Sequence, residues 1–282
     1  MCMGFGCNAA GVIGCRIIDS PRERLIASMT NNFVPCNGRF PALIAIISMF
    51  FIGTAVSLWN SVISAFLLAC VIVIGVIMTF VVSKLLSLTI LRGEPSSFTL
   101  ELPPYRRPQI GQVIIRSIFD RTLFVLRRAV AVAAPAGLVI WLMANVTFGE
   151  MTLLSRFSAI LDPFARLLGM DGVILFAFIL GMPANEIVVP IIIMSYMAQG
   201  SILEIDNLSV LMQLFVDNGW TWITAVSVIL FSLMHWPCST TLITIRRETG
   251  SLKWTAASFI IPTVAGMTIC FVFSSLARLI WR

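Results

Sequence analysis

The chain has 282 residues, of which 59% are hydrophobic and only 11% are charged, whereas soluble domains carry about 25% charged residues. This composition indicates several helices that cross a lipid bilayer, and it excludes an ordinary soluble domain. The 19 Lys and Arg outnumber the 13 Asp and Glu, which in a membrane protein is typical of cytoplasmic loops, so we expect no nucleic-acid partner. The seven cysteines are odd in number and lie scattered through apolar segments, which favours free thiols over a disulfide framework.

The N-terminal apolar stretch at 4–15 is too short and too rich in glycine to cross a bilayer as a regular helix. The segment 16–39 that follows is polar and basic. Two apolar runs at 41–58 and 61–82 are separated only by Trp59-Asn60, which predicts a tight helical hairpin with its turn at this dipeptide.

A basic, proline-rich linker occupies 84–107 and contains the sequence Glu101-Leu-Pro-Pro-Tyr105, which ends helices because proline has no backbone donor. Apolar and charged residues alternate at helical spacing over 109–128, which predicts an amphipathic helix in the membrane interface. A span at 129–146 and a second short amphipathic stretch at 153–168 follow this helix.

Three further apolar segments complete the chain, at 172–198, 221–245 and 254–280. We expect the first of them to be interrupted at Gly181-Met-Pro183 and again at Pro190, and the second at Pro237. Such interruptions expose backbone polar groups at membrane depth, which is tolerated only where they line a site or are covered by protein.

The distribution of charge between loops predicts the topology. The basic segments 16–39 and 84–107 both belong in the cytoplasm. If every later segment crossed the bilayer, the acidic loop 199–219 would also be cytoplasmic and the basic loop after 245 would lie outside. Treating 172–198 as a re-entrant hairpin, which enters and leaves on one side, corrects both assignments.

Two short patterns occur twice in the same order. The pattern Gly-x-x-x-Asn appears as Gly4-Phe-Gly-Cys-Asn8 and again as Gly181-Met-Pro-Ala-Asn185, each time inside an apolar segment. Each copy is followed downstream by a proline and a cysteine, first Pro35-Cys36 and then Pro237-Cys238. The recurrence indicates a duplicated unit, and transporters use such pairs of helix breaks for ion sites.

The side chains at these breaks offer sulfur, imidazole, amide and carboxylate ligands. They are Cys7, Asn8, Cys36, Asn37, Asn185, Glu186, His235 and Cys238. This mixture suits a borderline divalent transition metal better than Na⁺ or K⁺, which prefer oxygen ligands alone. No Cys-x-x-Cys pair is present, and the ligands come from separate segments, as a site that must release its metal requires.

Simpler interpretations stand beside the metal hypothesis. A free cysteine is often a small apolar core residue, which is the reading we favour for Cys2, Cys15, Cys70 and Cys270 and which stays open for the cysteines at the breaks. The only histidine, His235, is as well explained by a hydrogen bond across helices, and the asparagines by pairing with freed backbone groups. Glu186 is an intramembrane carboxylate, which indicates function or a capped helix end.

These motifs resemble the membrane domain of Feo-type ferrous iron transport protein B. The likeness covers nearly the whole chain in one collinear order and comprises Gly4-Phe-Gly-Cys-Asn8, Asp19-Ser-Pro-Arg-Glu-Arg-Leu25, the Cys36 segment up to Arg39, Arg92-Gly-Glu94, Glu101-Leu-Pro-Pro-Tyr105, Asn185-Glu186-Ile-Val-Val189, Pro237-Cys238 and Arg247-Glu248.

The resemblance implies paired gate motifs related to those of nucleoside carriers. It implies that Cys7, Cys36 and Cys238 match cysteines that handle iron and that Glu186 is the acidic residue of the second gate, whereas it implies no ligand role for His235. Members of the family carry an N-terminal GTP-binding domain, but these 282 residues contain no Gly-x-x-x-x-Gly-Lys-Ser/Thr loop. We therefore expect no enzyme activity in this chain and a separate GTP-binding subunit or domain as its partner.

The predicted fold is all-α, a polytopic transmembrane helix bundle with broken and re-entrant helices and interfacial amphipathic helices. It forms one membrane domain in two parts, 1–107 with the first gate and 108–282 with the second. The predicted function is transport of Fe²⁺, as substrate and not as a permanent cofactor, across a bacterial or archaeal cytoplasmic membrane. The predicted metal ligands are Cys7, Cys36, Cys238, Glu186, Asn8 and His235.

Two other functions stay open at this point. One is a nucleoside-type carrier in which asparagine and glutamate at the breaks bind a ribose, and the other is a truncated membrane subunit that does not transport. Membrane lipid is an expected partner, and assembly with a second copy of the chain is left open. The sequence leaves metal selectivity, direction and energy coupling undetermined.

Overall fold

The computed structural model describes residues 2–52, 58–92, 111, 124–148, 151–197 and 208–280. Within these residues the chain is helical, apart from a short antiparallel hairpin in which β1 (Thr147–Phe148) pairs with β2 (Met151–Thr152). Three of the described helices are long and apolar enough to cross a membrane, and a bent helix pair makes up to four. The predicted all-α membrane fold is confirmed.

The first part of the chain contains short helices around one long helix. Its elements are η1 (Cys2–Phe5), α1 (Asn8–Gly14), η2 (Cys15–Ile17), α2 (Pro21–Thr30), η3 (Asn31–Phe33), α3 (Phe40–Ile47), η4 (Ser48–Ile52) and α4 (Leu58–Leu88). Helix α2 begins with proline, whose missing N–H is harmless there, and the Ser20 side chain accepts a hydrogen bond from Glu23 N.

The second part begins with a long helix and then contains the interrupted segments. Its elements are α6 (Phe124–Asn145), β1, β2, α7 (Leu153–Leu167), α8 (Gly172–Leu180), η6 (Asn185–Ile187), α9 (Val188–Tyr196), α10 (Leu208–Asp217), α11 (Trp222–Met234), α12 (Ser239–Thr249) and α13 (Leu252–Ile280). Helices α7 and α8 meet at an angle of 109°.

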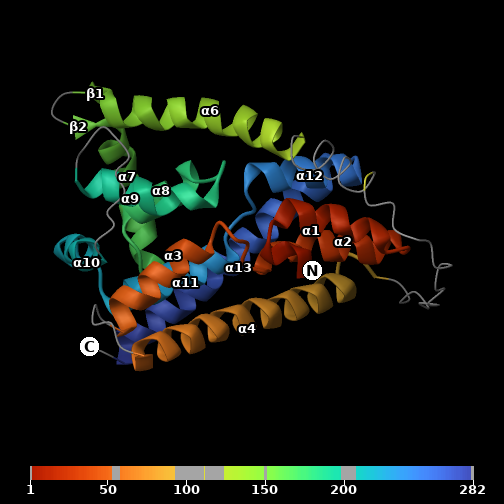
Figure 1. Cartoon of the computed structure of the whole chain (residues 1–282), viewed down its shortest axis with the longest axis horizontal. Coiled ribbons are helices and arrows are strands. Elements are labelled where there is room, and N and C mark those ends of the chain that lie inside the picture. The colour runs from red at the N-terminus through yellow and green to blue at the C-terminus, as the bar shows by residue number, and fades with distance from the viewer. Residues whose placement is uncertain are drawn as a thin grey trace.

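Figure 1 shows α4 along one side of the molecule and α6 along the opposite side, with α11 and α13 between them. Helix α11 packs against α13, α3 and α4, so the segment that is interrupted at Pro237 lies inside the bundle. Helices α2 and α12 lie toward one end of the long axis, and α7 and α10 lie toward the other (Figure 1).

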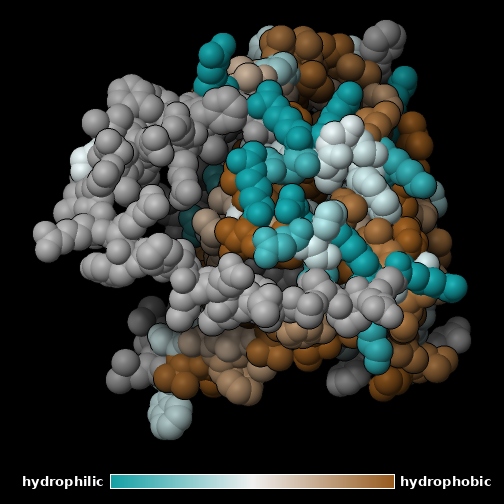
Figure 2. All heavy atoms as spheres, turned by 90° about the vertical axis from the view of Figure 1, so that its right-hand side faces the viewer, coloured by the Kyte–Doolittle hydropathy of each residue, from teal (hydrophilic) through white to brown (hydrophobic). Residues whose placement is uncertain are grey.

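Polar contacts hold several segments together at the α2 and α12 end. Arg16 forms an ion pair with Glu248 of α12 at 2.6 Å, and Arg22 of α2 donates hydrogen bonds to Leu91 O and to the Ser87 hydroxyl at the end of α4. Figure 2 looks onto this end and shows hydrophilic side chains gathered on it, with hydrophobic residues at its margins. The predicted topology requires these basic segments on one side of the membrane, and the re-entrant path itself stays a prediction.

The predicted boundaries need two corrections. Trp59 and Asn60 lie in the first turn of α4, so the predicted turn at this dipeptide is wrong, and the preceding residues 53–57 lie outside the described residues. Pro190 does not interrupt a helix, because it is the third residue of α9, where a missing N–H leaves no hydrogen bond unmade. The predicted interfacial helix at 109–128 lies almost entirely outside the described residues.

The other predicted segments agree with the structure. The span at 129–146 corresponds to α6, the amphipathic stretch at 153–168 to α7, and the last span to α13. The breaks at Gly181-Met-Pro183 and Pro237 are present as predicted, between α8 and η6 and between α11 and α12. These two breaks carry the predicted ligands Glu186, His235 and Cys238.

Candidate functional site

The first interrupted segment turns at Cys7. This residue caps the N-terminus of α1 with an extended backbone, at φ −154° and ψ 125°, and its carbonyl accepts the hydrogen bond from Gly11 N at 2.9 Å. The Cys7 side chain is exposed, whereas Asn8, the first residue of α1, is buried. The break thus leaves a thiol at the surface and turns an amide inward.

The second interrupted segment has the same local geometry. Ala184 caps η6 at φ −150° and ψ 121°, close to the values of Cys7, and Asn185 begins η6 as Asn8 begins α1. Asn185 is buried and Glu186 is exposed. The two Gly-x-x-x-Asn sequences therefore fold alike, which supports the duplicated unit.

Each Pro-Cys sequence is tied to the break that precedes it in the chain. The backbone N–H of Asn37, after Cys36, donates to Gly6 O at 3.4 Å, and the N–H of Ser239, after Cys238, donates to Met182 O at 2.9 Å. The donors correspond in the two copies, since each directly follows the cysteine. The acceptors, Gly6 and Met182, differ by one position within the Gly-x-x-x-Asn sequence. Cys36 and Cys238 are both partly buried.

The two copies also contact each other. A methyl group added at Gly38 would lie 2.9 Å from both Cγ and Oε1 of Glu186, so the glutamate of the second break lies against the loop that carries Cys36. Helix α1 packs against α12, which Cys238 caps. The Cys238 thiol lies within electrostatic range of the thiols of Cys36 and Cys7.

The predicted thiols and the predicted carboxylate thus come from four separate segments and meet in one region. Among the described residues, no group of three or more His, Cys, Asp or Glu side chains is close enough to hold one metal ion. The arrangement is therefore not a closed structural metal site of the tetrahedral kind.

His235 is buried and its ring nitrogens both have neighbours. Nδ1 lies 3.1 Å from Phe231 O and 3.0 Å from Ser232 O, and Nε2 lies 3.3 Å from Asn185 Oδ1. Carbonyl oxygens only accept, so Nδ1 carries the proton of the neutral ring, and Nε2 accepts from Asn185 if the amide presents its nitrogen. The histidine therefore connects the second break to α11 by hydrogen bonding.

A buried arginine joins the two Pro-Cys loops. Arg39 is 1% exposed, and its Nη1 donates to Asn32 O at 3.0 Å and to Leu233 O at 3.1 Å. Its Nη2 donates to Asn32 Oδ1 at 3.1 Å, and the same oxygen accepts from Asn8 Nδ2 at 3.4 Å. Asn32 Nδ2 in turn donates to His235 O at 2.6 Å. One polar network therefore connects all the interrupted segments.

The network lies in the segment 16–39, for which the basic sequence predicted a cytoplasmic position. Asn31, Asn32 and Arg39 of this segment are almost fully buried. Arg39 forms no ion pair with a carboxylate in the part of the chain that the structure describes, and the thiols of Cys36 and Cys238 lie within its electrostatic range. The sequence signal for burial is the Asn31-Asn32 pair followed by an apolar run up to Cys36.

Asn31 anchors the first break. Methyl groups added at Gly4 or Gly11 would lie 2.7 Å and 2.6 Å from Asn31 Oδ1, so the side chain fills the space that these two glycines leave. Its Nδ2 donates to Asn8 O at 3.0 Å. The glycines of this segment are required for close packing around a buried amide.

Helix interruptions that bring thiol, amide and carboxylate side chains together at the ends of apolar helices are typical of one class, the multi-pass membrane proteins whose broken helices line a site. Two family models match the chain, "Ferrous iron transport protein B C terminus" at residues 68–120 and "Nucleoside recognition" at residues 126–252. The chain is similar to the C-terminal part of ferrous iron transport protein B. The resemblance inferred from the sequence is confirmed.

Relatives named Fe(2+) transporter FeoB are similar to nearly the whole chain. The protein from Staphylococcus aureus strain MSSA476 is 28% identical over 289 residues, which cover 99% of this chain and 40% of the relative. Those from Synechocystis and Methanocaldococcus jannaschii are 29% and 25% identical and cover 96% and 100% of the chain. The chain spans about 40% of the length of the relatives it matches. No solved structure matches it at a significant level.

Proposed function

We propose that the chain is the permease part of a ferrous iron uptake system. The observation that carries the proposal is the meeting of Cys7, Cys36 and Cys238 with Glu186 at two helix breaks of the same local geometry. The relatives are named as Fe²⁺ transporters, which supports iron as the substrate.

The chemistry of the side chains fits ferrous iron in transit. Thiolates and a carboxylate give a borderline divalent ion ligands of mixed softness. Conduction requires ligands strong enough to replace water and few enough at each point to let the ion leave. Three thiols and one carboxylate that do not close around a single ion meet both conditions.

The buried Arg39 guanidinium adds an electrostatic component. An unpaired charge in a protein interior is unfavourable, and neutral carbonyl groups compensate only part of it. The thiols of Cys36 and Cys238 lie within electrostatic range of this positive charge. Asn8 and His235 act in this scheme through the network, as residues that hold the breaks in place.

The remaining components of the system are outside this chain. A GTP-binding domain or subunit is the proposed partner, because the relatives are longer and the chain has no phosphate-binding loop of the P-loop type. The proposed location is the cytoplasmic membrane of a bacterium or archaeon, with the α2 and α12 end facing the cytoplasm.

The test is uptake of ⁵⁵Fe²⁺ by cells that make the whole gene product and have no other ferrous iron uptake system. Replacing Cys7, Cys36 and Cys238 together by serine is expected to lower uptake by about tenfold or more, because even outer-shell changes at metal sites alter metal affinity by about 10–100-fold. Uridine uptake is measured beside it and is expected to stay at background.

A matched control replaces Cys2, Cys15 and Cys70 by serine. These cysteines belong to η1, η2 and α4 and not to a Pro-Cys sequence, and Cys15 donates to Gly11 O at 3.3 Å, a bond that serine also makes. The control is expected to keep wild-type uptake at equal protein levels. Wild-type Fe²⁺ uptake by the variant without Cys7, Cys36 and Cys238 would contradict the proposed role of the thiols. Uridine uptake above background would indicate a nucleoside as the substrate instead of iron.

A further inference from the structure

Two cavities lie where α7 turns into α8. Figure 1 shows α7 toward the end of the molecule opposite α2 and α12. The larger has a volume of about 510 Å³ and is lined by residues of α7, the start of α8 and the end of α9. Its polar lining is rich in oxygen and contains no sulfur or imidazole. The lining includes Ser155, Ser158, Asp162, Asp171, Ser195, Tyr196 and Asn218.

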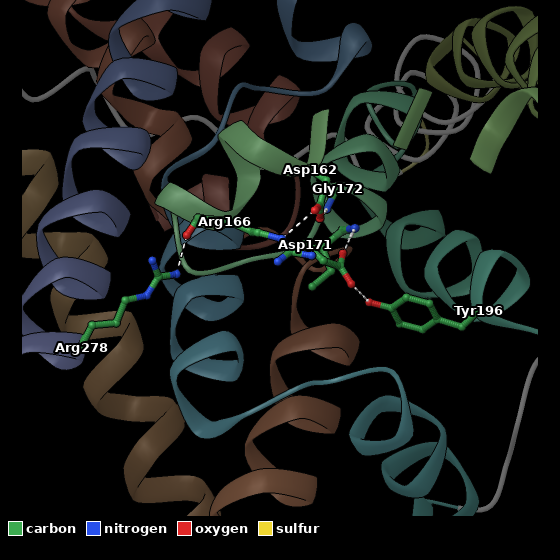
Figure 3. Close-up of polar contacts among 7 residues, drawn as sticks. Asp162, Arg166, Asp171, Gly172, Tyr196 and Arg278 are labelled. Carbon is green, nitrogen blue, oxygen red and sulfur yellow. Dashed lines mark hydrogen bonds and ion pairs between the residues drawn. The ribbon is translucent and has the colours of Figure 1, made fainter. Parts of the chain in front are cut away.

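Asp171 carries a negative charge on the wall of this cavity. Its Oδ1 accepts a hydrogen bond from Ile174 N at 2.7 Å, and its Oδ2 accepts one from the Tyr196 hydroxyl, as Figure 3 shows. The Tyr196 oxygen itself accepts from Trp220 Nε1 at 2.8 Å. All of these partners are neutral, and Asp171 has no ion-pair partner among the residues that the structure describes.

The larger cavity is also lined by one ion pair. Arg166 Nε pairs with Asp162 Oδ2 at 2.6 Å, and the second oxygen of Asp162 accepts from Gly172 N at 3.1 Å. Arg278 lines the smaller cavity and is directed to the carbonyl of Arg166 at the end of α7 (Figure 3). Among the residues that line the larger cavity, the formal charge left after this ion pair is the negative charge of Asp171.

An unpaired hydroxyl also lines the same cavity. Ser158 is 3% exposed, and its Oγ has no hydrogen-bond partner. A buried hydroxyl without a partner is unfavourable unless it meets a ligand or water. The cavity thus combines an unbalanced carboxylate with an unsatisfied oxygen ligand.

We propose that this cavity binds a partly hydrated, hard divalent cation through Asp171 and Ser158. Carboxylate and hydroxyl oxygens with room for several waters are the surroundings that Mg²⁺, Mn²⁺ and hydrated Fe²⁺ take. The site is distinct from the thiol region, because its residues belong to α7, α8 and α9, and it is separated from the second break by the length of α8.

The test uses Mn²⁺ as the probe and electron paramagnetic resonance of free Mn²⁺ as the readout. It is carried out on the detergent-solubilised whole protein in which Cys7, Cys36 and Cys238 are serine, so that the thiols do not contribute. The Asp171→Asn change keeps an N-cap for α8, because asparagine is also a preferred cap. It is expected to weaken Mn²⁺ binding at this site by at least about tenfold, because it removes the net charge.

Ser158→Ala separates a ligand role from a structural one. The hydroxyl makes no hydrogen bond within the protein, so its loss is expected to leave the melting temperature unchanged or higher while weakening Mn²⁺ binding several-fold. Ser227→Ala is the matched control, since Ser227 is equally buried and unpaired but lines neither cavity. It is expected to leave Mn²⁺ binding unchanged.

Excess Mg²⁺ is expected to displace Mn²⁺ from this site, because hard oxygen ligands bind both ions. Mn²⁺ binding that is the same in the Asp171→Asn and Ser158→Ala proteins as in their parent would overturn the site. Because the parent lacks the three thiols, this result would leave the proposed iron pathway unaffected.

Discussion

Gly11→Ala is expected to destabilise the chain, although alanine is the better helix former. The added methyl group would lie 2.6 Å from Asn31 Nδ2 and Oδ1 and 2.9 Å from Asn31 Cγ, so the buried amide must move. Its bond to Asn8 O at 3.0 Å is then lost, which costs about 1–3 kcal/mol. Overpacking adds about 1–3 kcal/mol, and the gain in helix propensity returns about 1 kcal/mol. The net loss is about 1–5 kcal/mol.

Gly14→Ala is the matched control in the same helix. Its methyl group would meet only Met3 Sδ, at 2.8 Å, which is the far end of a flexible and exposed side chain. The change is therefore expected to be neutral or stabilising by up to about 1 kcal/mol. Thermal unfolding of the purified protein in detergent measures both variants, and Gly11→Ala is expected to lower Tm by at least about 2 °C. Equal Tm values for the two variants would refute the assignment of Asn31 as a packed anchor.

Two further changes test single contacts. Gly38→Ala is expected to change the free energy of unfolding by less than about 0.5 kcal/mol, because the exposed Glu186 side chain can move away from the added methyl group. The same movement takes the carboxylate away from the Cys36 loop, so Fe²⁺ uptake is expected to fall. Wild-type uptake by this variant would contradict a role of Glu186 in the pathway. Arg16→Ala is expected to reduce the free energy of unfolding by less than about 1 kcal/mol, because the Arg16 side chain is exposed in its ion pair with Glu248. The difference between the two proteins is expected to vanish in high salt. A large loss that does not depend on salt would show that the pair is not a surface ion pair.

The interruptions of the helices were predictable because their causes are local. Proline removes a backbone donor, so Pro237 had to end α11 or distort it. Gly181 and Pro183 act in the same way within the second segment. Pro190 shows that a proline does not always interrupt a helix, because its effect depends on where the helix begins. Helix α9 begins at Val188, after the break at Gly181, so Pro190 lies in its first turn.

The packing around the candidate site was not predictable from local patterns. Arg39 was read as a loop charge because charge segregation is the usual explanation of a basic residue in a membrane protein. Its acceptors include Leu233 O, which lies 194 residues away in the sequence. The contact of Glu186 with Gly38 likewise joins distant segments and leaves no trace in residue spacing.

The matching backbones of Cys7 and Ala184 have a consequence for the direction of an ion's path. Duplication with equal geometry would by itself give a pathway with two equivalent halves, but the corresponding positions carry a thiol in one copy and a methyl group in the other. The positions two residues further on differ as well, with buried Ala9 in the first copy and exposed Glu186 in the second. The two breaks are thus alike in local backbone geometry and different in side-chain chemistry, so the proposed iron pathway has two ends that are not equivalent.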